Sequence, residues 1–279
     1  MDWNRAKTLL IVAFLFLNLF LAWQYAQNRM GYVTEELAES SGIPLEELLR
    51  VNQVTLAGPV PDEVVKAKPR FVTYQRLQSP ERGFPVVLSN MDEEEGIRES
   101  IRQYLPLIEE FSYDGLLSRE REGERVYFQR LEQGVAFSAP LLLYLEDGGE
   151  WQGYTGIYVE EEGEGEEQQL LSGAQTLGNL LENRYIPAGA RVEEVRFGYY
   201  GRFLDADVQV LAPVWRVVYA AEARAEEMAS PEGESMRAPD APLQRQMLYV
   251  NAVTGRVEVA DPLETLLQLP DNGKGQPVP

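Results

Sequence analysis

The first feature of the hydrophobic pattern is an uninterrupted apolar run near the start of the chain. Residues 8–28 read TLLIVAFLFLNLFLAWQYAQN and contain no charged side chain. As a helix, this run would be roughly 31 Å long, which matches the ~30 Å hydrocarbon thickness of a bilayer. Because the run is apolar on every face, it does not have the pattern of an amphipathic helix at the surface of a soluble core. We therefore predict a transmembrane helix over residues 8–28.

The charges on either side of this run predict its orientation. Arg5 and Lys7 precede it, and the strongly acidic bulk of the chain follows it. The positive-inside rule then places residues 1–7 in the cytoplasm and the rest of the chain after residue 28 outside, in a single-pass protein of the cell membrane. A cleaved signal peptide is the alternative, but its apolar stretch is ordinarily only ~7–15 residues, and Ala22-Trp23-Gln24 is not a small-x-small cleavage site. We expect a retained anchor.

One polar side chain interrupts the middle of the predicted span. Asn18 lies near the bilayer centre, and Phe14, Leu21 and Ala22 share its face at helical spacing. An amide in hydrocarbon favours a hydrogen-bonding partner on another helix, worth ~0.5–2 kcal/mol. The alternative is that a single Asn is simply tolerated. We take these four residues as the candidate contact with partner helices in the membrane.

The pattern after the span predicts a helical stalk and a linker over residues 29–69. Residues 31–52 read as a helix, a break at Gly42-Ile43-Pro44 and a second helix. Three prolines within residues 57–69 then predict an extended linker.

The remaining pattern predicts two α+β subdomains of similar order, residues 70–160 and residues 168–263. Tyr127 and Pro140 are 13 residues apart, as are Tyr200 and Pro213, and the two pairs are offset by 73 residues. A helix precedes each pair at about the same offset, which indicates an internal repeat. Each unit would place its helix on one face of an antiparallel sheet.

The individual elements follow from periodicity and caps. The predicted helices cover residues 93–105 and 174–184, and Ser172 with Gln175 forms a capping box for the second helix. Alternation predicts strands at residues 70–77, 125–131, 135–137, 141–146 and 153–160 in the first unit, and at residues 192–200, 208–211, 214–220, 246–251 and 255–260 in the second.

Three segments lack such periodicity and are expected to be loops. Residues 160–167 read EEEGEGEE, where self-repulsion and glycine favour a solvated loop. Residues 229–242 are expected to form an inserted loop between two strands, and residues 264–279 a flexible tail. Trp151, Trp215, Tyr199 and Tyr200 are expected to be core residues of the sheets, although they could also line a groove.

The amino-acid composition then excludes several common types of catalytic site. The 279 residues include no cysteine and no histidine, so thiolate zinc sites, imidazole ligands and His-dependent triads are excluded. The formal net charge of −20 argues against nucleic acid as a partner, because a phosphate backbone needs a basic face.

No motif supplies the missing chemistry. The sequence has no GxGxxG, no phosphate-binding loop and no GxSxG. Glu146 and Asp205 flank apolar strands, but nothing isolates them as the paired carboxylates of a glycosidase. We therefore expect no enzyme, and no catalytic, cofactor-binding or metal-binding residues.

Several segments carry a resemblance to a known family. The opening MDWNRAKTLLIVAFLFLNLFLAWQY looks like the start of the YycI family, with a Met-Asp-Trp segment, basic residues and one membrane helix. The runs LSGAQ at residue 171, FGYY at residue 197, LAPVWRV at residue 211 and YVNAVTG at residue 249 resemble the C-terminal half of that family. The closing pattern also resembles PepSY-type units, which are non-enzymatic α+β modules.

The resemblance implies a regulatory role. YycI proteins are accessory regulators of an essential sensor histidine kinase, YycG or WalK, that governs cell-wall metabolism in Gram-positive bacteria. They act in the membrane beside a related single-pass protein, YycH, and the family has no catalytic residues to transfer. The implied partners are the kinase, YycH and membrane lipid around the anchor, in a homo- or hetero-dimer. The alternative is an extracytoplasmic PepSY-like binding or inhibitor module that acts on a wall or protease partner.

Overall fold

The computed structural model describes residues 14, 17–18, 43–63, 66–79, 86–87, 94–121, 123–145, 150–203, 206–222, 243–258 and 263. The helices within these ranges are α2 (Leu45–Asn52), α3 (Glu94–Arg102), a 3-10 helix η1 (Pro106–Glu110), α4 (Gly115–Glu120) and α5 (Gly173–Glu182). The strands are β1 (Thr55–Leu56), β2 (Lys66–Ala67), β3 (Arg70–Gln78), β4 (Val86–Val87), β5 (Phe111–Tyr113), β6 (Glu124–Arg130), β7 (Val135–Leu145), β8 (Glu150–Glu164), β9 (Gln168–Gln169), β10 (Arg191–Tyr200), β11 (Gln209–Glu222), β12 (Leu243–Asn251) and β13 (Val257–Glu258).

The described strands form one large mixed sheet and one short pair. The main path of the large sheet is β1-β10-β11-β3-β8-β7-β6-β5, with β12 and β13 attached beside β11, and β4 beside β8; β2 pairs with β9 separately. Two antiparallel meanders, β6–β7–β8 and β10–β11–β12, supply most of the ladder. The pairings of β1 with β10 and of β10 with β7 are parallel.

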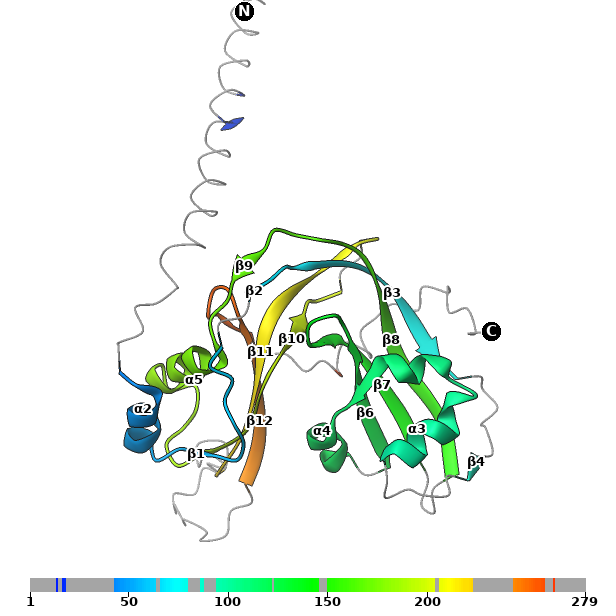
Figure 1. Ribbon diagram of the computed structural model, residues 1–279, viewed down its shortest axis with the longest axis horizontal. Coiled ribbons are helices and arrows are strands. Elements are labelled where there is room, and N and C mark those ends of the chain that lie inside the picture. The colour runs from blue at the N-terminus through cyan, green and yellow to red at the C-terminus, as the bar shows by residue number, and fades with distance from the viewer. Residues whose placement is uncertain are drawn as a thin grey trace, which may run out of the picture.

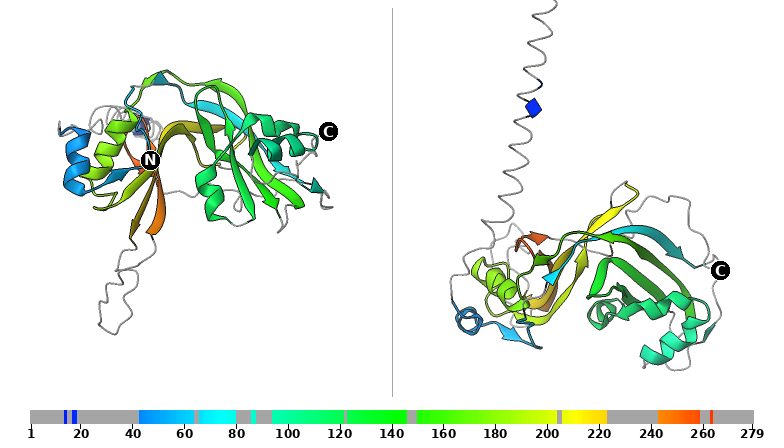
Figure 2. Two further views of the ribbon diagram at one scale, coloured as in Figure 1. Left: turned by 60° about the horizontal axis from the view of Figure 1, so that its bottom comes forward. Right: turned by 45° about the horizontal axis from the view of Figure 1, so that its top comes forward.

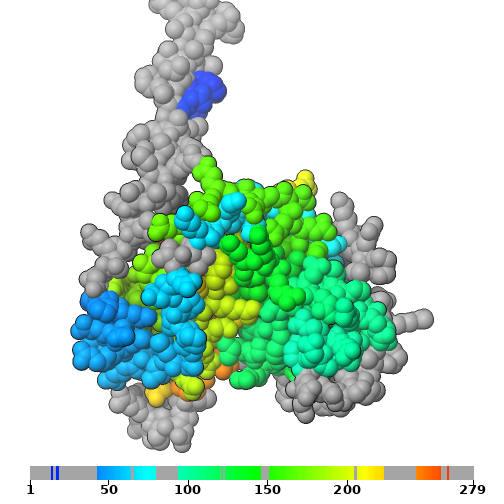
Figure 3. Space-filling view, viewed as in Figure 1, coloured from blue at the N-terminus to red at the C-terminus, as the bar shows by residue number. Residues whose placement is uncertain are grey.

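The sheet divides into two lobes that lie side by side (Figures 1 and 3). Figure 1 also shows β3 and β8, with β2 and β9, forming an arch over them, which we call the strand arch. We call them the α5 lobe, made of α2, α5, β1 and β10–β13, and the α3 lobe, made of α3, η1, α4 and β3–β8. One apolar core extends from beneath α5 into the other lobe and includes Leu177, Trp215 and Phe137. A second core lies beneath α3 and includes Ile97 and Trp151.

The two lobes share few backbone pairings. β11 and β3 have three register pairs, and β10 and β7 have one, Tyr199 with Ala136. At this crossing the backbones approach closely, because a Cβ on Gly198 would lie 2.5 Å from the Phe137 ring and 2.5 Å from the Val135 carbonyl oxygen. Only glycine fits there without displacing a neighbour.

The class and most elements match the sequence predictions. The fold is α+β, α3 and α5 lie where helices were expected, and the capping box of Ser172 and Gln175 is present in both directions. The second stalk helix is α2. The four aromatic side chains expected in the core, Trp151, Tyr199, Tyr200 and Trp215, are all buried.

The expectation of purely antiparallel sheets was wrong. Strands from both predicted subdomains join one mixed sheet, because β10 passes β7 in the parallel direction at the lobe crossing. The subdomain boundaries at residues 70–160 and 168–263 stay a prediction, as do the stalk and the tail boundaries. Residues 1–13, 15–16 and 19–42 and the tail 264–279 lie outside the described residues.

The expectation of a loop over residues 160–167 was also wrong in its first part. β8 continues to Glu164 and pairs with β3 along the acidic run. Self-repulsion does not dominate, because Lys68 and Arg70 pair with glutamates of this run and Thr73 donates a hydrogen bond to Glu162. Opposite charge across the ladder offsets like charge along the strand.

Two predicted strand breaks are absent. Residues 135–137 and 141–146 were expected as separate strands, and so were residues 208–211 and 214–220, but they belong to the continuous strands β7 and β11. Pro140 lies beside a register shift between β6 and β7, where the ladder is already interrupted. A proline is tolerated at such an irregularity.

Candidate functional site

The predicted membrane contact falls largely outside the described residues. Phe14 and Asn18 are helical and exposed, with Phe14 62% exposed, whereas Leu21 and Ala22 are not described. Within the described part of the chain, no helix combines the length and the apolar character needed to cross a bilayer. The transmembrane helix over residues 8–28 and the four contact residues stay predictions.

The structure does not place the two candidate catalytic carboxylates. Glu146 and Asp205, the carboxylates that sequence reasoning weighed for hydrolysis, lie outside the described residues. In the described ranges, no three acidic side chains come together in a way that could hold a metal ion.

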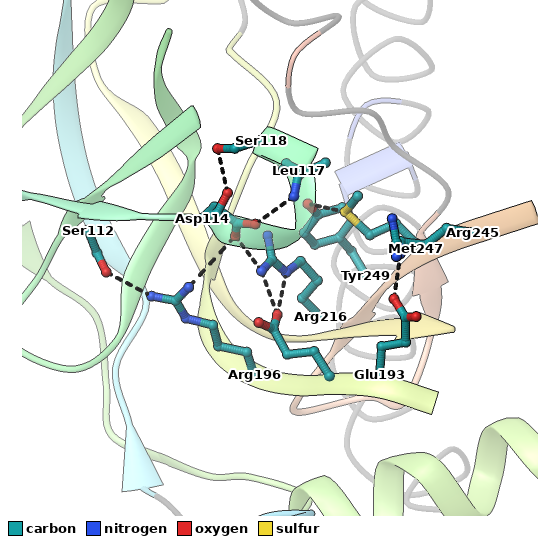
Figure 4. A network of polar contacts seen from close by, with 11 residues as sticks. Ser112, Asp114, Leu117, Ser118, Glu193, Arg196, Arg216, Arg245, Met247 and Tyr249 are labelled. Atoms are coloured by element: carbon teal, nitrogen blue, oxygen red, sulfur yellow. Dashed lines mark hydrogen bonds and ion pairs between the residues drawn. The ribbon is translucent and has the colours of Figure 1, made fainter. Parts of the chain in front are cut away.

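The structure brings four charged side chains together where the two lobes meet. We call Asp114, Glu194, Arg196 and Arg216 the ionic junction (Figure 4). Asp114 comes from the start of α4 in the α3 lobe, and the other three come from β10 and β11 in the α5 lobe. Two carboxylates and two guanidinium groups make the junction formally neutral.

Arg216 is the centre of the ionic junction. Its side chain is 0% exposed. Its Nη2 donates to Asp114 Oδ2 at 2.5 Å, and its Nε donates to Glu194 Oε1 at 2.9 Å. The guanidinium also lies 4.8 Å from the ring centroid of Phe137 and 5.6 Å from that of Phe128, within range of a cation–π interaction. One nitrogen, Nη1, is buried without a hydrogen-bond partner among the described residues.

Asp114 performs two tasks with its two carboxylate oxygens. Oδ1 accepts a hydrogen bond from the backbone N–H of Leu117 at 3.0 Å and so caps α4. Oδ2 accepts from Arg216 and lies 3.7 Å from Nη1 of Arg196. Arg196 in turn donates to Ser112 Oγ at 3.2 Å. Loss of Asp114 would therefore remove a helix cap and the central contact between the lobes.

Burial and neighbouring charges shift the pKa values of the two arginines in opposite directions. Burial alone lowers the pKa of Arg216, but the carboxylates of Asp114 and Glu194 outweigh it and hold that pKa above its ordinary value. Arg196 has a lowered pKa because of burial and the neighbouring charge of Arg216. Guanidinium groups stay charged at neutral pH, so the junction is suited to holding the lobes together.

A second charged cluster lies where the start of β3 meets the end of β8, beside the β2–β9 pairing. We call Lys66, Lys68, Arg70, Glu161, Glu164 and Glu167 the clasp. Lys68 Nζ lies 2.7 Å from Glu164 Oε2, and Lys66 Nζ lies 3.6 Å from Glu167 Oε2 beside the β2–β9 pairing. Arg70 Nη1 donates to Glu161 Oε2 at 2.9 Å and also pairs with Glu164.

Solvent reaches most of the clasp. The side chains of Lys66 and Glu167 are 65% and 55% exposed, whereas that of Arg70 is 5% exposed. The hydrogen bond from Lys68 lowers the pKa of Glu164, and the same bond raises the pKa of Lys68. The Lys68–Glu164 pair therefore stays charged over a wider pH range than the two free side chains would, and the exposed pairs of the clasp are open to screening by salt.

Sequence reasoning missed the ionic junction. Asp114 and Arg216 are 102 residues apart, so no local pattern joins them. A signal was nevertheless present, because Arg216 is the single charge within the apolar run VWRVVY. A charged residue inside a buried strand requires a partner.

Comparison with known proteins gives one family match. A family model described as "YycI protein" matches residues 45–229, which is 185 of the 279 residues. Among solved structures, the chain is similar to an uncharacterized protein from Eubacterium rectale ATCC 33656, with 10% identity and a TM-score of 0.38, over 78% of this chain and 81% of that chain. That likeness is too low to carry an argument. Comparison with curated proteins finds no match.

Proposed function

The chain belongs to the YycI family, a family of regulatory accessory proteins, and from this membership we propose that it modulates the sensor histidine kinase of the YycFG two-component system. The family match over residues 45–229 carries this proposal. The protein acts by contact and not by catalysis. This role agrees with a sequence that has neither histidine nor cysteine and no recognisable catalytic motif.

We place the regulatory contact in the membrane. Residues 8–28 form a single transmembrane helix, with the N-terminus in the cytoplasm and the two lobes outside the cell. Phe14, Asn18, Leu21 and Ala22 contact helices of the kinase YycG and of YycH. The exposure of Phe14 and of the neighbouring Leu17, 62% and 52%, leaves this part of the chain free for such contacts.

The energetic requirement for regulation is small. A kinase that exchanges between two states responds to any neighbour that binds one state better than the other. A coupling free energy of about 1–3 kcal/mol changes the balance by about 5–150-fold. One interhelical hydrogen bond from Asn18, worth about 0.5–2 kcal/mol, is of this order.

The test uses the full chain in cells from which its own gene has been deleted. Wild type, Asn18→Leu and the apolar control Leu17→Ile are expressed at equal levels. We expect Asn18→Leu to reduce co-purification of the kinase by about fivefold, as for the loss of one interhelical hydrogen bond, and to shift expression of the kinase-controlled genes. Leu17→Ile should match wild type. Unchanged association and unchanged expression for Asn18→Leu would remove Asn18 from the proposal, and unchanged expression on deletion of the gene would overturn it.

A further inference from the structure

One face of the β11–β3–β8 strip carries apolar side chains that no described element covers. Val208 and Val210 are 47% and 51% exposed, whereas Gln209 between them is buried. Val210 is the register partner of Phe71 on β3, and Phe71 is the register partner of Gly163 on β8. Val210, Phe71 and Gly163 therefore form a row across three strands on one face of the sheet.

The same sheet face is covered further along by α3. Leu77 lies on the Phe71 side of β3, three alternations along, and belongs to the core beneath α3 with Ile97 and Ile101. Figures 1 and 2 show α3 and α4 against the strands of the α3 lobe, and no described helix over the strand arch. The apolar surface thus continues past the end of its helical cover.

Acidic side chains border this surface. Glu160 is the register partner of Thr73, and Glu162 accepts a hydrogen bond from Thr73 Oγ1 at 3.1 Å, which places both carboxylates beside the Phe71 row. Both glutamates are exposed, and neither has a basic partner within ion-pair distance among the described residues. We call Val208, Val210, Phe71, Glu160 and Glu162 the valine patch.

We propose that the valine patch is a docking surface for an amphipathic segment of another protein, whose apolar side chains are flanked by Lys or Arg. The half-exposed side chains of Val208 and Val210 supply the apolar contact. Glu160 and Glu162, which have no basic partner among the described residues, supply charge complementarity. A second copy of this chain would bring the same carboxylates against them, and an anionic lipid surface would be repelled by them. A basic amphipathic segment satisfies both parts of the patch, in the manner of a helix laid on an apolar surface.

This proposal goes beyond the proposed function, because the valine patch lies outside the predicted membrane contact and its partner need not be the kinase. The test places a photocrosslinking amino acid at position 210 of the full chain in its native cells. A control places it at position 51, where Val51 is 69% exposed on α2 outside the patch. Crosslinked peptides are identified by mass spectrometry, and position 208 serves as a second site if the position-210 protein fails to accumulate.

We expect position 210, and not position 51, to give an adduct with a peptide of another protein in which apolar residues are flanked by Lys or Arg. Glu160→Gln with Glu162→Gln should reduce the yield by about threefold, as for two surface charges. The absence of an adduct, an adduct between two copies, an adduct within one chain, or a yield unaffected by the glutamine substitutions would each overturn the proposal. Expression of the kinase-controlled genes is measured in the same cells. This readout tests the proposed function, whereas the adduct tests the docking surface, so failure of one can be told from failure of the other.

Discussion

The ionic junction and the clasp are both clusters of ion pairs, and they differ in how much solvent reaches them. The ionic junction joins the two lobes, whereas the ion pairs of the clasp join residues 66–70 to residues 161–167. The ionic junction surrounds Arg216, whose side chain is 0% exposed, whereas the clasp includes Lys66 and Glu167, which are more than half exposed. Exposed ion pairs contribute about 0–1 kcal/mol each and are screened by salt. Breaking a buried pair leaves an uncompensated charge, at a cost of about 3–5 kcal/mol. Similar residue types therefore have different consequences in the two clusters.

The arrangement of the two lobes depends on the ionic junction more than on the clasp. The lobes share three register pairs between β11 and β3 and one between β10 and β7. With so few backbone bonds, side chains must determine the lobe arrangement. Asp114 and Arg216, which are 102 residues apart in sequence, join the lobes in addition to the apolar core that extends through both of them. The clasp joins segments that already run side by side as β2 and β9.

The largest effect is expected for Arg216→Met. The substitution keeps an apolar stem of similar length but leaves the buried carboxylate of Asp114 without its partner. We expect the free energy of unfolding to fall by about 3–5 kcal/mol, measured by urea denaturation of the full chain in detergent. Arg191→Met, at an exposed position of β10, is the matched control and should be near neutral. Equal stability of the two variants would contradict the role of the ionic junction.

A slightly smaller effect is expected for Asp114, and two substitutions separate its tasks. Asp114→Ala removes both the helix cap and the charge, with an expected loss of about 2–4 kcal/mol. Asp114→Asn keeps a capping oxygen and removes only the charge, so it should be less destabilising by about 1 kcal/mol. Thermal unfolding by circular dichroism compares the two. If Asn were as harmful as Ala, the capping contribution would be absent.

The crossing itself is tested by Gly198→Ala. A methyl group there would overlap the Phe137 ring and the Val135 carbonyl, each 2.5 Å from the added carbon. We expect destabilisation of about 1–3 kcal/mol from overpacking. Gly58→Ala is the control, because nothing lies within 4 Å of its added carbon. A neutral Gly198→Ala would show that β10 and β7 do not need this close approach.

The smallest effect is expected at the clasp. The pKa of Glu164 is lowered by its hydrogen bond from Lys68, so the stabilisation is complete above the ordinary pKa of 4.5 and is lost as the pH falls through the lower folded pKa. Lys68→Gln should remove that acid-side dependence and leave stability at neutral pH nearly unchanged. The thermal midpoint is measured from pH 7 to pH 3 at low and high salt. A large loss at pH 7, insensitive to salt, would contradict the exposed character of the clasp.

The sequence predicted the elements that depend on local pattern. Alternation located β3, β6 and β10, and the Ser172–Gln175 pair located the start of α5, because each signal lies within a few residues. The acidic end of β8 was misread, since its countercharges, Lys68 just before β3 and Arg70 at its start, lie more than 90 residues away in sequence. The mixed sheet was also missed, because the parallel pairing of β10 with β7 joins residues that are far apart in sequence.

The candidate site was less accessible to such reasoning. The four predicted membrane contacts were drawn from one helical face, which is a local pattern, and they stay predictions. The ionic junction depends on β10 and β11 meeting the start of α4, a tertiary arrangement that periodicity does not encode. Arg216 inside an apolar strand could have indicated that a buried partner exists, but not that the partner is Asp114.

The regulatory role is tested most directly with purified components. The full-length kinase is reconstituted in nanodiscs with and without the full chain, and its rate of autophosphorylation is measured. Our account predicts a change of about fivefold or more when the chain is present, which corresponds to a coupling free energy of about 1 kcal/mol, and a smaller change with Asn18→Leu. An identical rate with and without the chain, in the presence of YycH, would contradict it.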